Sequence, residues 1–226
     1  MLGTLASFLL IVLIAYLWGS IPSGYWMGKL LRGKNFDIRV YGSHKTGATN
    51  VRRTLGNVPA AIVLIVDISK GIGPTLLATL PFFYHAGWGP PLAGLAALLG
   101  HCFPVFINFR GGRGVLTGVG ALFVLSPLVA LIGTSTTVGA IIIWRYVSLG
   151  SILGSVIVFL CGLIFLALGW INPPYVTYTL IAPLLVILFH RDNISRLLAG
   201  TERKLGQKVE AATSTTASEE VPTNVS

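Results

Sequence analysis

Three short polar segments of the chain combine glycine, hydroxyl and amide side chains with cations. They cover residues 41–53 (YGSHKTGATNVRR), 101–117 (HCFPVFINFRGGRGVLT) and 189–204 (FHRDNISRLLAGTERK). Glycine lets neighbouring backbone N–H groups turn toward one point, hydroxyl groups add hydrogen-bond donors, and arginine forms two parallel hydrogen bonds to a phosphate. These segments are therefore the candidate sites of chemistry in this sequence.

The residues of the first segment favour phosphate binding. Its glycines and hydroxyls precede a predicted helix, whose N-terminal end attracts anions, and Arg52 and Arg53 add a cationic clamp. The segment does not match the Walker sequence of nucleotide-binding proteins. Spacing alone leaves two interpretations open, a phosphate site and an ordinary polar loop between helices.

The second segment places Arg110 and Arg113 among three glycines. Glycine on both sides of an arginine suits a backbone that must approach a ligand closely. The alternative is a tight hairpin that needs glycine for its turn. Two arginines, an asparagine and a histidine in one segment exceed what a turn requires, and this favours ligand binding.

The third segment is predicted to be helical, so that His190, Asn193 and Arg196 share one face. An imidazole at the membrane edge can accept a proton, and the amide of Asn193 can donate to a developing oxyanion. The alternative is an amphipathic helix that lies in the membrane interface.

Other reactive side chains suggest structural roles. Asp67 and Lys70 are one turn apart in an apolar run, which predicts an ion pair facing the protein interior. Cys102 and Cys161 have neither the framework of disulfides nor the spacing of metal ligands, so neither metal nor cofactor is expected. Pro22 predicts a break in the first apolar helix.

The composition places these segments in a membrane protein. Hydrophobic residues make up 54% of the 226 residues and charged residues only 10%, whereas soluble domains carry about 25% charged residues. We therefore predict an all-α integral membrane protein. The formal charge of +9 would suggest a nucleic-acid partner for a soluble protein. Membrane topology explains it here, and no nucleic acid is expected.

Charge-poor runs predict membrane-spanning helices over residues 3–21, 58–80 and 88–109. Two further runs, 115–144 and 146–189, are each too long for one comfortable span. We expect each of these to form two helices, with hinges near residues 133–136 and 172–174. The sequence thus predicts seven transmembrane helices.

The distribution of cations supports this number. With seven spans, 15 of the 16 lysines and arginines lie on one face, whereas six spans would move Arg145 and the basic tail to the other face. Because short cytoplasmic loops are rich in Lys and Arg, the N-terminus is predicted outside and the C-terminus in the cytoplasm. Residues 1–205 form one transmembrane domain, and the polar residues 206–226 are expected to be a disordered cytoplasmic tail.

Several blocks in register resemble the bacterial acyl-phosphate:glycerol-3-phosphate acyltransferases, the PlsY family of integral membrane enzymes. The resemblance extends from Gly19 to about Leu205. The blocks are GSIPSGYWMGK (19–29), GATNVRRTLG (47–56), DISKG (67–71), HCFPVFINFRGGRGV (101–115), RYVSLGS (145–151) and HRDNISRLLAGTERK (190–204). The family's seven-helix fold and cytoplasmic active site agree with the topology predicted from charge.

The resemblance implies an enzyme of the cytoplasmic membrane that acylates the 1-hydroxyl of glycerol 3-phosphate from a fatty acyl phosphate. The products are lysophosphatidic acid and phosphate, and neither metal nor acyl-CoA is required. His190 and Asn193 match the family's catalytic pair. Positions that match substrate-binding residues are Ser43, Gly47, Thr49, Asn50, Arg53, Arg113 and, as a weaker match, Ser148; Arg110 joins them from the glycine-rich turn.

The chain departs from the family pattern in two places. Arg113 replaces the usual lysine, which keeps the charge and allows two parallel hydrogen bonds. His44 and Lys45 replace the usual Gly-Asn, which removes a residue with easy access to positive φ and an amide side chain. A paralogue that acylates another polyol phosphate is therefore an alternative.

A second alternative is a membrane carrier or binder of a phosphorylated or lipid anion. The sequence shows no repeat and no inverted pair of interrupted helices of the kind that builds transporters from two halves. The outward half of the predicted spans is also almost wholly apolar. Both observations favour the enzyme.

Overall fold

The computed structural model describes residues 2–207, and every regular element in that range is helical. Its α-helices are α1 (Leu2–Gly19), α2 (Ser23–Arg32), α3 (Ala48–Leu55), α4 (Asn57–Leu77), α5 (Pro81–Tyr84), α6 (Gly89–Cys102), α7 (Val115–Leu125), α8 (Pro127–Trp144), α9 (Val147–Ala167), α10 (Pro173–Phe189) and α11 (Arg191–Leu198). Three 3₁₀ turns join them, η1 (Ile38–Val40), η2 (His85–Gly87) and η3 (Val105–Ile107). Apart from Gly206 and Gln207, the predicted tail lies outside the described residues.

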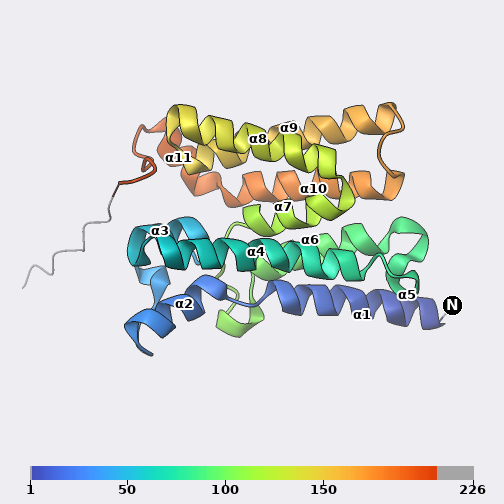
Figure 1. Cartoon of the computed structure of the whole chain (residues 1–226), viewed down its shortest axis with the longest axis horizontal. Helices are drawn as coiled ribbons and strands as arrows, with labels where there is room; N and C mark the ends of the chain where they lie inside the picture. Colours follow the sequence, from blue (N-terminus) through green and yellow to red (C-terminus); the bar gives the residue numbers. More distant parts are fainter. Residues whose placement is uncertain (1, 208–226) are drawn as a thin grey trace, which may run out of the picture.

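The long helices run along the long axis of the molecule (Figure 1). Helix α1 packs on α6, α4 on α7, α8 on α9, and α9 on α10. The short amphipathic helices α2, α3 and α11 gather at one end, and α5 lies at the other end with the N-terminus (Figure 1). All three candidate segments therefore contribute to the same end of the bundle.

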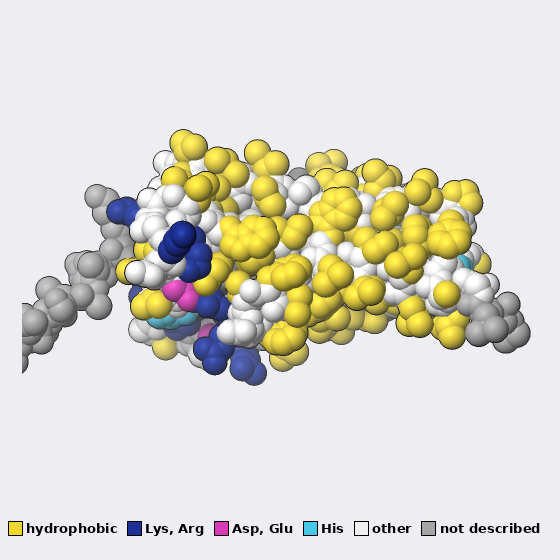
Figure 2. Space-filling model, turned by 90° about the horizontal axis from the view of Figure 1, so that it is seen from below, with side chains coloured by type: hydrophobic (Ala, Val, Ile, Leu, Met, Phe, Trp, Pro, Cys, Tyr) yellow, Lys and Arg dark blue, Asp and Glu magenta, His cyan; other side chains and the backbone are white. Residues whose placement is uncertain are grey.

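The prediction of a membrane-spanning helical bundle is confirmed in its general form. Five helices of the described residues are long and apolar enough to cross a bilayer, and α10 with α11, bent by 57°, makes a sixth candidate. Helix α7 is a shorter apolar helix of 11 residues. Hydrophobic side chains cover the sides of the molecule, whereas Lys, Arg, Asp and Glu gather at one end (Figure 2).

The position of one predicted hinge is wrong. Residues 133–136 lie inside α8, and the break falls instead at Ser126, before Pro127. Proline lacks an N–H group and clashes with the preceding turn, so it begins a new helix. Gly133 instead lets α8 pack closely on α9, where an added Cβ would overlap Val158.

The other two predicted breaks are present. Helix α1 ends at Gly19 and α2 begins at Ser23, directly after Pro22. Helix α9 ends at Ala167, and α10 begins at Pro173.

Small residues permit the closest helix contacts near the site. A Cβ built on Gly71 of α4 would overlap the carbonyl oxygen of Thr117 in α7, and a Cβ on Gly120 of α7 would overlap that of Ile68 in α4. Two helix backbones therefore lie in direct contact, as is typical of membrane helices with small residues at their interface. This contact fixes α7, which begins directly after Arg113.

Replacing Gly71 by alanine is expected to lower the free energy of unfolding by about 1–3 kcal/mol, because the added methyl group forces α4 and α7 apart. Thermal unfolding of the purified protein in detergent measures the effect. Gly139→Ala in α8 is the matched control, since a Cβ there meets no atom within 4 Å. Equal midpoints for the two variants would contradict the close contact.

Candidate active site

A cavity of about 430 Å³ opens at the polar end of the bundle and is lined by residues of all three segments. Nine of the ten predicted site residues line it, namely Ser43, Gly47, Thr49, Asn50, Arg53, Arg113, Ser148, His190 and Asn193. Arg110, the tenth, is exposed and is absent from the lining, so the structure does not bring it together with the other nine.

Asn50 organises the first segment. Its side-chain Nδ2 donates to the carbonyl oxygens of Ile38, Tyr41 and Lys45 at 2.8–3.1 Å, and its Oδ1 accepts from the N–H of Ser43 at 2.9 Å. These contacts use the hydrogen-bonding capacity of the amide. Asn50 therefore shapes the loop before α3, and its contact with the substrate stays a prediction.

His44 occupies the backbone conformation for which the family's glycine is suited. Its φ is +56°, and its ring Nδ1 lies 2.9 Å from the carbonyl oxygen of Arg39. A left-handed conformation costs a non-glycine residue about 1–2 kcal/mol. The next residue, Lys45, lines the cavity.

The second segment folds back onto the end of α6. The N–H of Gly111 donates to the carbonyl oxygen of Cys102, and that of Gly112 to the carbonyl oxygen of His101, both at 3.1 Å. The turn then enters α7 at Gly114, whose φ is +80°. Arg113 projects from this turn into the cavity, where its buried Nε has no hydrogen-bond partner among the described residues.

The cavity holds more positive charge than the protein neutralises. Burial lowers the pKa of Arg113 to about 10, with a further contribution from Arg196, and it lowers the pKa of Lys45 and Arg53 in the same direction. Within residues 2–207, none of the three cations forms an ion pair with a carboxylate. The site therefore has the electrostatics of an anion-binding pocket.

His190 presents a neutral imidazole to the cavity. It lies just past the last residue of α10, outside the spanning helices, and is 3% exposed. Its Nδ1 donates to the carbonyl oxygen of Val186 at 2.7 Å, because a carbonyl can only accept. Burial lowers the pKa of His190 to about 4, and Arg113 acts in the same direction. At neutral pH the other nitrogen, Nε2, is therefore a hydrogen-bond acceptor.

Glu202, which the sequence analysis missed, joins three site residues. Its Oε1 accepts from Ser148 at 2.8 Å and from Asn193 at 2.7 Å, and its Oε2 accepts from Arg196 at 2.7 Å. Burial acts to raise the pKa of Glu202, but these hydrogen bonds outweigh it and hold the pKa below its ordinary value. The carboxylate therefore ties α9 and α11 together beside the cavity.

These contacts alter the roles expected for two residues. The hydroxyl proton of Ser148 is committed to Glu202. One N–H of the Asn193 amide also goes to Glu202, and the atom of Asn193 left without a partner is the buried Oδ1, which is an acceptor. Asn193 thus offers the site an acceptor in addition to the second N–H of its amide. No group of three or more His, Cys, Asp or Glu side chains within residues 2–207 could hold a metal ion.

The chain is similar to known proteins over most of its length. A family model described as glycerol-3-phosphate acyltransferase matches residues 9–200. A protein of that name from Thermoanaerobacter sp. is 45% identical over 201 residues, which cover 89% of this chain and 97% of the relative. Another from Synechocystis sp. is 44% identical over 212 residues, covering 89% and 92%.

Two crystal structures have the same fold. Both are of PlsY (YgiH), described as an integral membrane glycerol 3-phosphate acyltransferase, and each match covers 88% of this chain and 96% of that one. The glycerol 3-phosphate form gives a TM-score of 0.79 at 39% identity. The lysophosphatidic acid form gives 0.75 at 37% identity.

Histidine NMR on the purified protein provides a test of the site. His190 is expected to stay neutral, with the proton on Nδ1, down to about pH 4, whereas an ordinary histidine titrates near pH 6.5. Because the unfolded chain would bind this proton at a higher pH, the contribution of His190 to stability is present above about pH 6.5 and decreases as the pH falls toward 4. Titration of the His190 signals near pH 6.5 would show that the ring is not buried as described.

Proposed function

Because the chain belongs to the glycerol-3-phosphate acyltransferase family, we propose that it transfers a fatty acyl group from an acyl phosphate to the 1-hydroxyl of glycerol 3-phosphate. The products are lysophosphatidic acid and inorganic phosphate. The observation that carries this proposal is the cavity with three unneutralised cations at the end of an apolar bundle. Both substrates are phosphates, and one of them also bears a hydrocarbon chain.

The proposed topology follows the distribution of charge. The chain crosses the cytoplasmic membrane seven times, with α7 as a short span, the N-terminus outside and the C-terminus in the cytoplasm. Charged side chains gather at the end of the molecule that holds the cavity (Figure 2). Since Lys and Arg are retained on the cytoplasmic side, the cavity opens to the cytoplasm.

The cations bind the phosphate groups. Lys45 and Arg53 come from the first segment and Arg113 from the second, and all three line one cavity, so that two phosphates can be held close together. The unpartnered Nε of Arg113 supplies a donor that gains a partner only when an anion enters. Charge-assisted hydrogen bonds to phosphate are about twice as strong as neutral ones, which favours binding in a buried site.

Acyl transfer needs little acid–base chemistry from the protein. The oxygen of the 1-hydroxyl forms a bond to the acyl carbonyl carbon, the bond from that carbon to the phosphate oxygen breaks, and the hydroxyl proton passes to the released phosphate. With a pKa of about 4, neutral His190 is a weak base. Its Nε2 and the Oδ1 of Asn193 are therefore acceptors that orient glycerol 3-phosphate through its two hydroxyl groups.

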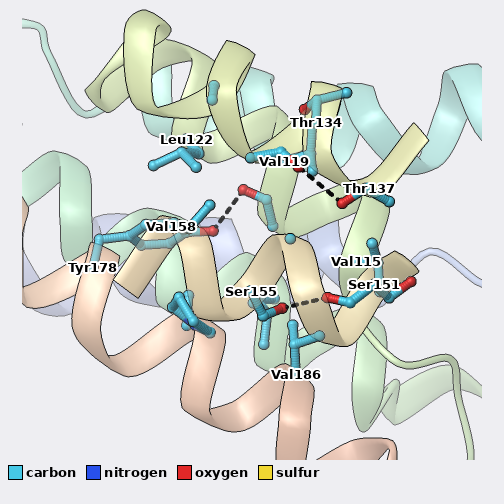
Figure 3. A pocket seen from close by; sticks show the side chains of 17 residues that line it. Val115, Val119, Leu122, Thr134, Thr137, Ser151, Ser155, Val158, Tyr178 and Val186 are labelled. Atoms are coloured by element: carbon cyan, nitrogen blue, oxygen red, sulfur yellow. Dashed lines mark hydrogen bonds between the residues drawn. The ribbon is translucent and has the colours of Figure 1, made fainter. Parts of the chain in front are cut away.

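A second pocket, enclosed by α7, α8, α9 and α10, receives the acyl chain (Figure 3). It shares five lining residues with the large cavity, namely Val115, Val119, Thr134, Thr137 and Ser151. The hydroxyls of Thr137 and Ser155 donate to carbonyl oxygens of their own helices, and that of Tyr178 donates to Gly118 (Figure 3). The polar atoms of these side chains are thus satisfied internally, and the pocket is mainly apolar.

The proposal is tested with purified protein in detergent or a lipid cubic phase. Palmitoyl phosphate and glycerol 3-phosphate are expected to yield phosphate and lysophosphatidic acid, measured by phosphate release and mass spectrometry. A preparation that binds either substrate but releases no phosphate would contradict the proposed reaction and favour a carrier or binder. Release only with a different polyol phosphate would identify the chain as a paralogue.

Arg53→Ala and Arg113→Ala are each expected to raise the KM for glycerol 3-phosphate by about tenfold or more, because each removes a charged hydrogen-bond donor worth about 1.5–3 kcal/mol. Steady-state kinetics at saturating palmitoyl phosphate measure the change. Arg52→Ala and Arg110→Ala are matched controls, since both side chains are exposed and neither lines the cavity. An equal rise in KM for Arg52→Ala and Arg110→Ala would show that Arg53 and Arg113 have no specific role in binding glycerol 3-phosphate.

Val119→Phe is expected to shift donor preference toward shorter acyl chains, because the larger side chain fills the junction between the two pockets. Each methylene that no longer enters loses about 0.8 kcal/mol of burial. The ratio of kcat/KM for decanoyl and palmitoyl phosphate measures this shift. Val156→Phe, on the exposed face of α9, should leave the ratio unchanged. If Val119→Phe and Val156→Phe gave the same ratio of kcat/KM, the acyl chain would not bind in this pocket.

A further inference from the structure

A buried polar cluster lies at the base of the cavity, where the proposed reaction leaves it without a role. Asp67 and Lys70 of α4 are 1% and 2% exposed. The Nζ of Lys70 and the Oγ of Ser23, at the start of α2, each donate to Oδ1 of Asp67 at 2.6 Å. The Nζ of Lys70 also donates to Ser23 at 3.1 Å. The predicted ion pair is therefore present, and it extends to a second helix.

The cluster also reaches α6 and α7. The Oγ1 of Thr117 in α7 donates to the backbone carbonyl oxygen of Asp67 at 2.9 Å. The Nδ1 of His101, in the last turn of α6, lies 3.7 Å from Oδ1 of the same aspartate. Asp67 thus contacts residues of three other helices, and both Asp67 and His101 line the cavity.

His101 in turn supports the turn that carries Arg113. Its carbonyl oxygen accepts the N–H of Gly112 at 3.1 Å. A Cβ built on Gly112 would overlap Nε2 of His101, so the imidazole lies directly against this residue. The glycine at position 112 is therefore required by the position of the ring, and the ring is adjacent to the backbone of Arg113.

The Arg113 side chain depends on this backbone support. Among the described residues, no ion pair or hydrogen bond holds its Nε. The place of its guanidinium in the cavity is then set by the course of the turn. A buried ion pair contributes little net stability compared with apolar residues of the same size, and its better-supported use is to specify one arrangement of the chain.

We propose that Ser23, Asp67, Lys70 and His101 form a positioning network that holds residues 111–114 so that Arg113 faces the phosphate of glycerol 3-phosphate. This inference rests on the proposed function of the cavity. The network does not touch the reacting atoms. It acts through the imidazole of His101, which lies against Gly112 on one side and 3.7 Å from the Asp67 carboxylate on the other; Lys70 and Ser23 in turn hold that carboxylate.

A double-mutant cycle between His101→Ala and Arg113→Ala tests the proposal. In the wild-type background, His101→Ala is expected to raise the KM for glycerol 3-phosphate about tenfold with kcat changed less than about twofold. In the Arg113→Ala background, the same substitution should change KM by less than about twofold, because the side chain that it misplaces is absent. The proposal would be overturned if His101→Ala raised KM by the same factor in the wild-type and Arg113→Ala backgrounds, or if it changed KM in neither.

Two further variants separate positioning from general stability. Gly112→Ala disturbs the same contact from the side of the turn, because its added methyl group would overlap the imidazole of His101. It should therefore raise the KM for glycerol 3-phosphate, and it provides a test even if His101→Ala does not fold. Thr179→Val removes a fully buried hydroxyl in α10, remote from the turn, and should lower thermal stability without changing KM. A rise in KM for Thr179→Val equal to that for Gly112→Ala would show a general loss of stability and would contradict the network.

Calorimetric titration with glycerol 3-phosphate provides a readout that does not depend on turnover. If the wild type binds glycerol 3-phosphate without transferring an acyl group, only the proposed reaction fails. The network is then supported by about tenfold weaker binding in His101→Ala and Gly112→Ala. Binding as tight as that of the wild type in both variants would refute the network whether or not acyl transfer occurs.

Discussion

The cavity contains three cations without carboxylate partners, and the surrounding structure depends on this unbalanced charge. Lys45, Arg53 and Arg113 lie at the polar end of the bundle, where burial weakens their hydration. The two carboxylates nearby do not neutralise them, since Asp67 is paired with Lys70 and Glu202 with Arg196. These pairs instead fix the helices that carry the site. The remaining charge is satisfied only when an anion binds.

Much of the fold follows from the sequence because bilayer physics acts on local composition. Long charge-poor runs predict the helices, and prolines mark where the next helix begins, at Pro22 before α2 and at Pro173 in α10. The grouping of the three polar segments was also predictable, since short loops rich in Lys and Arg are expected on one side of a membrane, and the charged side chains gather at one end of the molecule (Figure 2). The hinge between α7 and α8 was misplaced because the Gly-Thr-Ser-Thr stretch resembles a loop, whereas its small side chains serve helix packing.

The detailed site is less predictable, because its contacts join distant parts of the chain. Ser148 and Glu202 are 54 residues apart, and Ser23 and Asp67 are 44 apart. No local pattern encodes such pairs, although a glutamate in a strongly basic segment is a usable signal for Glu202. Asn50 and Arg110 illustrate a related point. Residue type shows what a side chain can bind, but only the fold shows whether its atoms are already engaged or point away from the cavity.

Positions 44 and 45 combine a left-handed backbone conformation with a cation that lines the cavity. His44 keeps the left-handed conformation that glycine adopts more easily, at a cost of about 1–2 kcal/mol. The amide of Asn50 binds three carbonyl oxygens around this position, which explains how the strained conformation is held. Lys45 adds a cation to the same wall of the cavity. The loop therefore depends on Asn50 for its geometry, while residues 44 and 45 can vary in charge.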